Sequence, residues 1–161
     1  VRSDVFPAGR VYYCHHSTPD LVWRQEWQKH PNGTTSMVEL VTVALDTASE
    51  AERFALLLKT DVKKDGNGAR YLNLDSCRLA VLTPEQYARR YGSLASLLKG
   101  RESIFGAIVF STNALSALNE LLSNLDDITT DCYPGRTIVR ISAYNTVLEF
   151  LDIEPVKSTT A

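Results

Sequence analysis

The sequence predicts an α+β fold of two βαβββ modules, each with one strand, one helix and then three more strands. Two observations lead to this prediction. The order strand, helix, strand, strand, strand occurs in residues 36–83 and again in residues 104–152, which is an internal repeat of elements rather than of residue identities. In addition, one module alone would leave a face of its sheet uncovered, so two modules are expected to curve around a shared cavity.

The first module, residues 36–83, is predicted from hydrophobic periodicity and turn residues. Its first strand is rich in Val and Leu. Its helix is amphipathic, because apolar side chains recur three and four positions apart. Asp-Gly-Asn-Gly then forms the turn of a hairpin, and one more strand closes the module. In order, the elements are expected at residues 36–46, 47–59, 61–64, 69–74 and 77–82.

A helical linker, residues 84–103, is expected between the modules. Thr83 and Pro84 supply a helix cap and a first-turn proline, and Gly92 divides the helix. The second module, residues 104–152, repeats the order of the first. Its elements are expected at residues 104–111 (strand), 113–124 (helix), 128–132, 136–141 and 146–152 (strands).

Residues 1–35 form an N-terminal arm that lies outside the repeat. A strand is predicted at residues 10–16 and a helix at residues 20–29, in which Trp23 and Trp27 lie one turn apart on one face. We interpret this Trp pair as packing, either against the open end of a module or against a second subunit. The tail, residues 153–161, is polar and is expected to fray.

Composition narrows the class of protein. The 161 residues are 44% hydrophobic and carry a formal net charge of −2, as in an ordinary globular domain. A nucleic acid partner is not expected without a basic excess. No membrane span is expected either, because the longest apolar run is far shorter than about 20 residues. No secretory signal is seen, and three widely spaced cysteines favour reduced thiols in the cytoplasm over a disulfide framework.

Two glutamates stand out because each lies in an otherwise apolar strand. A carboxylate in such surroundings must be paired, hydrogen-bonded, protonated or ligated. If Glu39 and Glu149 line one cavity, they form a proton-sharing pair or a site for a hard cation. The alternative is that both glutamates point to the sheet edge or pair with Arg78, Arg136 or Arg140. Alternation along a strand predicts these neighbours on the faces of the two glutamates: Met37, Val41, Val43 and Leu45 for Glu39, and Val147 and Leu151 for Glu149.

The paired modules resemble those of the vicinal oxygen chelate superfamily, which includes glyoxalases, bleomycin resistance proteins and dioxygenases. The likeness covers about residues 36–152, through segments such as MVELVTVALD, IFGAIVFST and TVLEFLD. Residues 15–33 (HHSTPDLVWRQEWQKHPNG) also resemble a stretch of bacterial glyoxalase-like proteins of unassigned function. There the stretch follows an earlier module, which implies that this chain corresponds to the C-terminal part of a longer architecture.

In catalytic members of that superfamily, four positions line a metal site. The resemblance places them at Glu39, Ala80, Phe105 (Gly106 if the register slips by one) and Glu149. Two of the four positions therefore offer oxygen ligands and none is histidine. No tightly bound metal is expected on this basis, and a weakly bound divalent metal is the alternative. Phe105 is expected to fill the space of the ion and to line the cavity together with Val41 and Ala80.

Three functions remain open from the sequence, with Glu39 and Glu149 as the candidate catalytic residues and metal ligands. The first is a glyoxalase-like protein of unassigned activity whose cavity binds a small organic ligand without a tightly bound metal. The second is a divalent-metal lyase, isomerase or dioxygenase, in which a histidine of the arm replaces a missing ligand. The third is a non-catalytic half or a dimerisation module of a longer protein, with a second copy of the chain as its partner.

Overall fold

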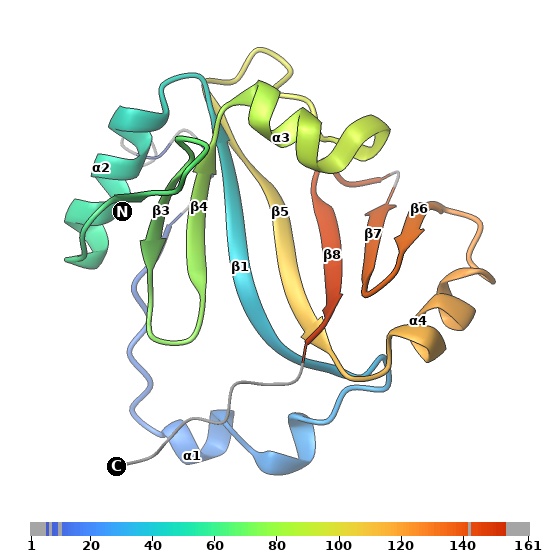
Figure 1. Cartoon of the computed structure of the whole chain (residues 1–161). Helices are drawn as coiled ribbons and strands as arrows, with labels where there is room; N and C mark the ends of the chain where they lie inside the picture. Colours follow the sequence, from blue (N-terminus) through green and yellow to red (C-terminus); the bar gives the residue numbers. More distant parts are fainter. Residues whose placement is uncertain (1–5, 7, 10, 142, 154–161) are drawn as a thin grey trace.

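The computed structural model describes residues 6, 8–9, 11–141 and 143–153, and contains one eight-stranded sheet (Figure 1). The strands run in the order β2-β3-β4-β1-β5-β8-β7-β6. They are β1 (Thr34–Ala44), β2 (Lys63–Lys64), β3 (Arg70–Asn73), β4 (Arg78–Leu82), β5 (Ser103–Thr112), β6 (Ile128–Tyr133), β7 (Arg136–Ile141) and β8 (Val147–Asp152). The helices are α1 (Pro19–Val22), α2 (Thr47–Leu58), α3 (Pro84–Tyr91) and α4 (Leu115–Leu122), with 3₁₀ turns η1 (Gln25–Trp27) and η2 (Gly92–Leu94).

The pairing of the strands divides the sheet into two equivalent halves. In the first half β1 is parallel to β4, and in the second half β5 is parallel to β8. The first strands of the halves, β1 and β5, pair antiparallel and join them into a continuous sheet. Every element predicted within the two modules is present, with ends that differ by no more than two residues from the prediction. The linker, predicted to be helical over residues 84–103, is helical only over α3 and η2. The predicted α+β fold of two βαβββ units is confirmed.

Helices cover the two faces of the sheet differently. On the outer face, α2 covers the first half and α4 the second, through apolar side chains such as Phe54 and Leu118. On the inner face, α3 and η2 cross the junction of the halves and pack Tyr87, Tyr91 and Leu94 against it (Figure 1). The linker therefore packs on the inner face, where the sequence predicted a cavity between the modules.

Local sequence explains why α3 lies where it does. Thr83, the predicted cap, forms a capping box with Gln86, in which each side chain accepts a hydrogen bond from the other residue's backbone N–H. Gly92 ends the helix with a positive φ of 56°. The Tyr87 hydroxyl donates to the Gly106 carbonyl at 2.7 Å and so ties α3 to β5.

Two irregularities in the β1–β5 pairing change which side chains face inward. A register shift between Met37 and Glu39 turns Met37 away from the face of Glu39, against the predicted alternation. A second shift near Val41 accommodates Gly106 on the inner face, where an added Cβ would lie 2.9 Å from the Tyr87 ring. Phe105 consequently points to the outer face and packs against Phe54, with ring centroids 6.4 Å apart.

The arm differs from the sequence prediction. Residues 11–16 form no strand, and the predicted helix is reduced to α1 and η1. A strand needs a paired neighbour and a short helix needs a packed face, and neither α1 nor η1 contains a buried residue. Trp23 and Trp27 are exposed rather than packed within this chain. The tail from residue 154 lies outside the described residues. In the described part of the chain no helix is long and apolar enough to cross a bilayer.

Candidate functional site

Glu39 and Glu149 lie in one row of residues that crosses the middle of the sheet. Glu39 on β1 is in register with Val109 on β5, and Val109 is in register with Glu149 on β8. The two glutamates therefore face inward from strands that are separated by one strand. They are 4% and 2% exposed, respectively. Burial of two carboxylates at this spacing demands compensating donors.

Arg90 of α3 supplies the donor that they share. Its Nη2 atom lies 2.8 Å from Oε2 of Glu39 and 2.9 Å from Oε2 of Glu149. The linker helix thus connects a carboxylate of the first half of the sheet to one of the second half. Charge-assisted hydrogen bonds of this kind are stronger than neutral ones, and a desolvated site strengthens them further.

Other donors complete the cluster. Arg78 donates from Nε and Nη2 to Oε1 of Glu39 at 3.1 and 2.9 Å, and Arg136 donates from Nε to Oε1 of Glu149. The Tyr91 hydroxyl donates to Oε2 of Glu149 at 2.7 Å. All four carboxylate oxygens consequently accept at least one hydrogen bond. Three arginines against two glutamates leave the cluster with one net positive charge.

The surroundings shift the pKa values of Arg90 and Tyr91 upward. Burial alone would lower the pKa of the Arg90 guanidinium, but the hydrogen bond to Glu39 and the charges of both glutamates outweigh it. For Tyr91, burial raises the pKa of the phenol, and the nearby Glu149 charge adds to this against the opposing effect of Arg90. Arg90 is therefore a permanent cation, and Tyr91 a permanent hydrogen-bond donor, in the ordinary pH range.

The residues around this cluster do not fit a divalent metal. Ala80 offers no ligand atom, Gly106 takes the inner position next to Phe105, and a guanidinium already bridges the carboxylates. In the described residues no group of three or more His, Cys, Asp or Glu is arranged to hold a metal ion. His15, His16 and His30 are exposed in the arm. Because metal and guanidinium would compete for the same oxygens, a metal would first have to displace Arg90.

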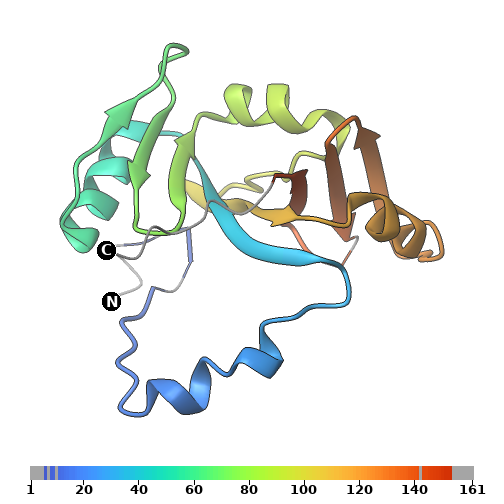
Figure 2. The ribbon, with the colours of Figure 1, turned by 60° about the horizontal axis from the view of Figure 1, so that its bottom comes forward.

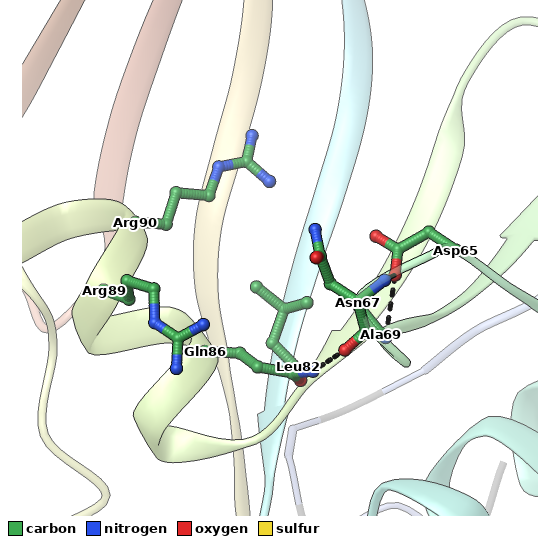
Figure 3. Close-up of a pocket in the computed structure, with 7 residues that line it drawn as sticks. All are labelled: Asp65, Asn67, Ala69, Leu82, Gln86, Arg89 and Arg90. Carbon is green, nitrogen blue, oxygen red and sulfur yellow. Dashed lines mark hydrogen bonds between the residues drawn. The ribbon is translucent and has the colours of Figure 1, made fainter.

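A groove of about 450 Å³ opens beside the cluster, between α3 and the turn that joins β2 to β3 (Figure 3). We call it the α3 groove. A smaller cavity of about 60 Å³ adjoins it and reaches down to Glu39, Arg78 and Ala80. Gln86 donates to the Asn67 carbonyl at 3.3 Å and closes the groove at one end. Its lining residues are Asp65, Asn67, Ala69, Leu82, Gln86, Arg89 and Arg90.

The predicted site residues fall into three groups. Glu39, Glu149 and Ala80 lie on the inner face at or near the arginine cluster. Val41 also faces inward, but it is fully buried in the core under α3. Phe105, which was expected to line the cavity, lies on the outer face because of the register shift at Gly106.

Sequence reasoning missed Arg90, Tyr91 and Tyr87, which supply most of the chemistry from α3. A signal was available in the amphipathic pattern of that helix. Tyr87, Arg90 and Tyr91 recur three and four positions apart and so share one face. The pairings of Glu39 with Arg78 and of Glu149 with Arg136 are those weighed from the sequence, whereas Arg140 donates to the Ala95 carbonyl instead.

Comparison with known proteins identifies the fold. No family model and no curated protein matches the chain. Among solved structures, a hypothetical protein of Bacillus halodurans C-125 superposes with a TM-score of 0.53 at 12% identity, over 77% of this chain and 98% of that one. Methylmalonyl-CoA epimerase of Mycobacterium tuberculosis superposes with a TM-score of 0.51 at 12% identity, over 79% and 93%.

These neighbours have the glyoxalase/bleomycin resistance/dioxygenase fold, and this chain has it too. The fold is thus that of vicinal oxygen chelate proteins, as the resemblance in the sequence implied. At 12% identity the likeness concerns the fold and does not extend to an activity.

Proposed function

We propose that this chain is a glyoxalase-like protein that binds a small organic anion in the α3 groove without a tightly bound metal. The observation that supports this most strongly is the bridge from Arg90 to Glu39 and Glu149. It puts a fixed positive charge in the place where the resemblance implies a metal. A ligand would then be oriented by guanidinium groups rather than by a metal ion.

The charges of the groove favour an anion. Arg89 is exposed at its edge and makes no hydrogen bond within the described part of the chain, and Arg90 lies deeper. The one acidic wall residue, Asp65, is engaged in its own turn, since its Oδ1 accepts from the backbone N–H groups of Asn67 and Ala69 at 2.9 and 3.0 Å (Figure 3). The side chain of Leu82 offers apolar contact for the organic part of a ligand.

A reaction is not assigned in this proposal. Glu39 and Glu149 accept hydrogen bonds from three arginines and Tyr91, so they serve to anchor Arg90 rather than to act as general bases. A metal-dependent lyase, isomerase or dioxygenase would require Arg90 to leave both carboxylates. We further propose a cytoplasmic protein, supported by the free thiols of Cys14, Cys77 and Cys132, and a second copy of the chain as its protein partner.

The proposal is tested by calorimetric titration of the full chain with acetate, succinate and citrate as probes, in the presence and absence of the uncharged chelator 1,10-phenanthroline. We expect one of these carboxylates to bind at one site per chain, equally with and without the chelator. Arg89→Ala should weaken that binding about tenfold, the equivalent of one charge-assisted hydrogen bond of roughly 1.4 kcal/mol.

Arg101→Ala is the matched control, because Arg101 is equally exposed but lies in the loop before β5, away from the groove. The affinity of the Arg101→Ala variant for the carboxylate probe should equal that of the unmodified chain. Absence of binding by all three probes, or binding that the uncharged chelator abolishes, would contradict the proposal.

A further inference from the structure

The α3 groove has walls of opposite charge. On one wall α3 contributes Arg89 and Arg90, and on the other the turn between β2 and β3 contributes Asp65. Figure 2 shows the hairpin of β2 and β3 rising on the same side of the sheet as α3, and Figure 3 shows the arginines across the groove from Asp65. The binding of an anion accounts for the positive wall and leaves the negative wall without a ligand group.

Both arginines of the groove keep hydrogen-bond donors available for a ligand. Arg90 uses only Nη2 for its bridge to the two buried glutamates, so Nε and Nη1 donate to no residue that the structure describes. The Arg89 guanidinium is exposed at the edge of the groove. Because a guanidinium can donate two parallel hydrogen bonds to one carboxylate, the positive wall can bind two carboxylate groups.

Asp65 keeps one carboxylate oxygen free. Its Oδ1 accepts from the backbone N–H groups of Asn67 and Ala69, which holds the side chain in the turn, whereas Oδ2 accepts no hydrogen bond from the described residues. The ion pairs found within the described ranges do not include Asp65. A carboxylate that is fixed on a groove wall without a cation favours a ligand with a positive group at that place.

The charge of the lining sets the charge of a matching ligand. The two buried glutamates are balanced by Arg78 and Arg136, one in each half of the sheet. Arg89 and Arg90 are therefore two positive charges against the single negative charge of Asp65. A ligand with two negative groups and one positive group complements these charges.

Apolar contact is available between the charged walls. Leu82 of β4 is buried at the floor of the groove, and Figure 3 shows its side chain between α3 and the hairpin. The groove volume of about 450 Å³ lies in the lower part of the range of roughly 300–1,000 Å³ that is usual for small-molecule sites. These features suit a short carbon skeleton that carries its charged groups at both ends.

We propose that the anion bound in the α3 groove is an amino dicarboxylic acid, with its carboxylates on Arg89 and Arg90 and its ammonium group on Asp65. A ligand of this class presupposes the proposed function, in which the groove binds a small organic anion. The side-chain amide of Asn67 lies on the same wall as Asp65 and can accept a hydrogen bond from the ammonium group.

Two pairs of probes isolate the ammonium group, because the members of each pair differ by that group alone. The pairs are L-aspartate with succinate and L-glutamate with glutarate, each titrated calorimetrically into the full chain at neutral pH. We expect the amino member of at least one pair to bind about tenfold more tightly than its counterpart, the equivalent of one charge-assisted hydrogen bond.

Equal affinities within both pairs, or tighter binding of the plain dicarboxylates, would overturn the amino dicarboxylate and leave the binding of an anion intact. Absence of binding by all four probes would overturn it as well. Acetate and citrate would then decide whether the proposed function falls with it.

Asp65→Asn tests the negative wall. The amide oxygen of the new side chain can still accept from the backbone N–H groups of Asn67 and Ala69, so the turn is kept while the charge is lost. The affinity for the amino dicarboxylate should fall about tenfold. The affinity for the plain dicarboxylate should rise, because a repelling charge is removed. A damaged fold would weaken both probes, so changes of opposite sign identify the charge of Asp65 as the cause.

Asp75→Asn is the matched control. Asp75 is also exposed, but it lies in the turn between β3 and β4 and outside the groove. This variant changes the net charge by the same amount and should leave every affinity unchanged. Arg89→Ala should weaken both members of a pair. An undiminished preference for the amino dicarboxylate in the Asp65→Asn variant would contradict the proposal, as would equal effects of Asp65→Asn and Asp75→Asn.

Discussion

Arg90 makes it possible for two carboxylates to be buried one strand apart. Without a cation between them, Glu39 and Glu149 would raise the free energy of the folded state, through both desolvation and mutual repulsion. Arg78 and Arg136 each neutralise one glutamate from its own half of the sheet, and only Arg90 contacts both. A single side chain of the linker therefore holds the halves together electrostatically.

Replacement of Arg90 by Met should lower the free energy of unfolding by about 2–4 kcal/mol. This value is near the lower end of the range of free energies lost when a buried ion pair is broken, because the Arg90 side chain is itself a quarter exposed. Urea unfolding at neutral pH measures it. Arg89→Ala on the same helix should change stability by no more than about 0.5 kcal/mol, as expected for an exposed side chain. A loss below about 1 kcal/mol for Arg90→Met would show that the bridge contributes little.

At the scale of elements, the packing of α3 on β5 depends on the absence of a side chain at Gly106. The Tyr87 ring lies against this glycine and its hydroxyl bonds to the Gly106 carbonyl. An added methyl group would meet the Val43 side chain at 2.7 Å as well as the ring at 2.9 Å. Either α3 or β1 would have to move, and both carry members of the glutamate–arginine cluster.

Gly106→Ala should therefore cost about 1–3 kcal/mol of stability, the usual range for overpacking a core. Thermal or urea unfolding gives the value. Gly66→Ala is the control, because nothing lies within 4 Å of a Cβ there, and it should be close to neutral. If the two substitutions proved equally mild, the close packing of α3 on β5 would be disproved.

At the scale of the whole molecule, two buried tyrosines link stability to alkaline pH. Burial raises the pKa of Tyr87 and of Tyr91 in the folded state. At a pH below the pKa of an unfolded tyrosine, about 10, both residues are protonated in the folded and the unfolded state. Their full contribution to the free energy of unfolding is then present. Above it the unfolded chain loses protons that the folded chain keeps, so stability falls as pH rises.

The expected slope for the two tyrosines is a loss of about 2.7 kcal/mol per pH unit above pH ~10. Unfolding curves at increasing pH measure it, and tyrosinate absorbance in the near ultraviolet should show that two of the seven tyrosines ionise only with unfolding. Tyr91→Phe should remove one of these late ionisations, whereas Tyr144→Phe, at an exposed position, should leave both of them in place. Ionisation of all seven in the folded protein would refute this.

The order of the elements and the burial of two carboxylates follow from local features of the sequence. Hydrophobic periodicity, the Thr83–Gln86 capping box and the turn residues are local signals, so they specify helices, strands and caps without reference to the rest of the chain. In the same way, a glutamate among Val and Leu residues in a strand is already destined for the sheet interior.

The set of residues that contact those carboxylates depends on long-range packing instead. The register shifts that put Gly106 inward and Phe105 outward arise from the pairing of β1 with β5, whose partners are distant in the chain, from Ala44 with Ser103 to Thr34 with Thr112. The approach of Arg90 to both glutamates depends on where α3 crosses the sheet. The arm lost its predicted helix and strand for the same reason, because marginal elements form only where a packing partner is present.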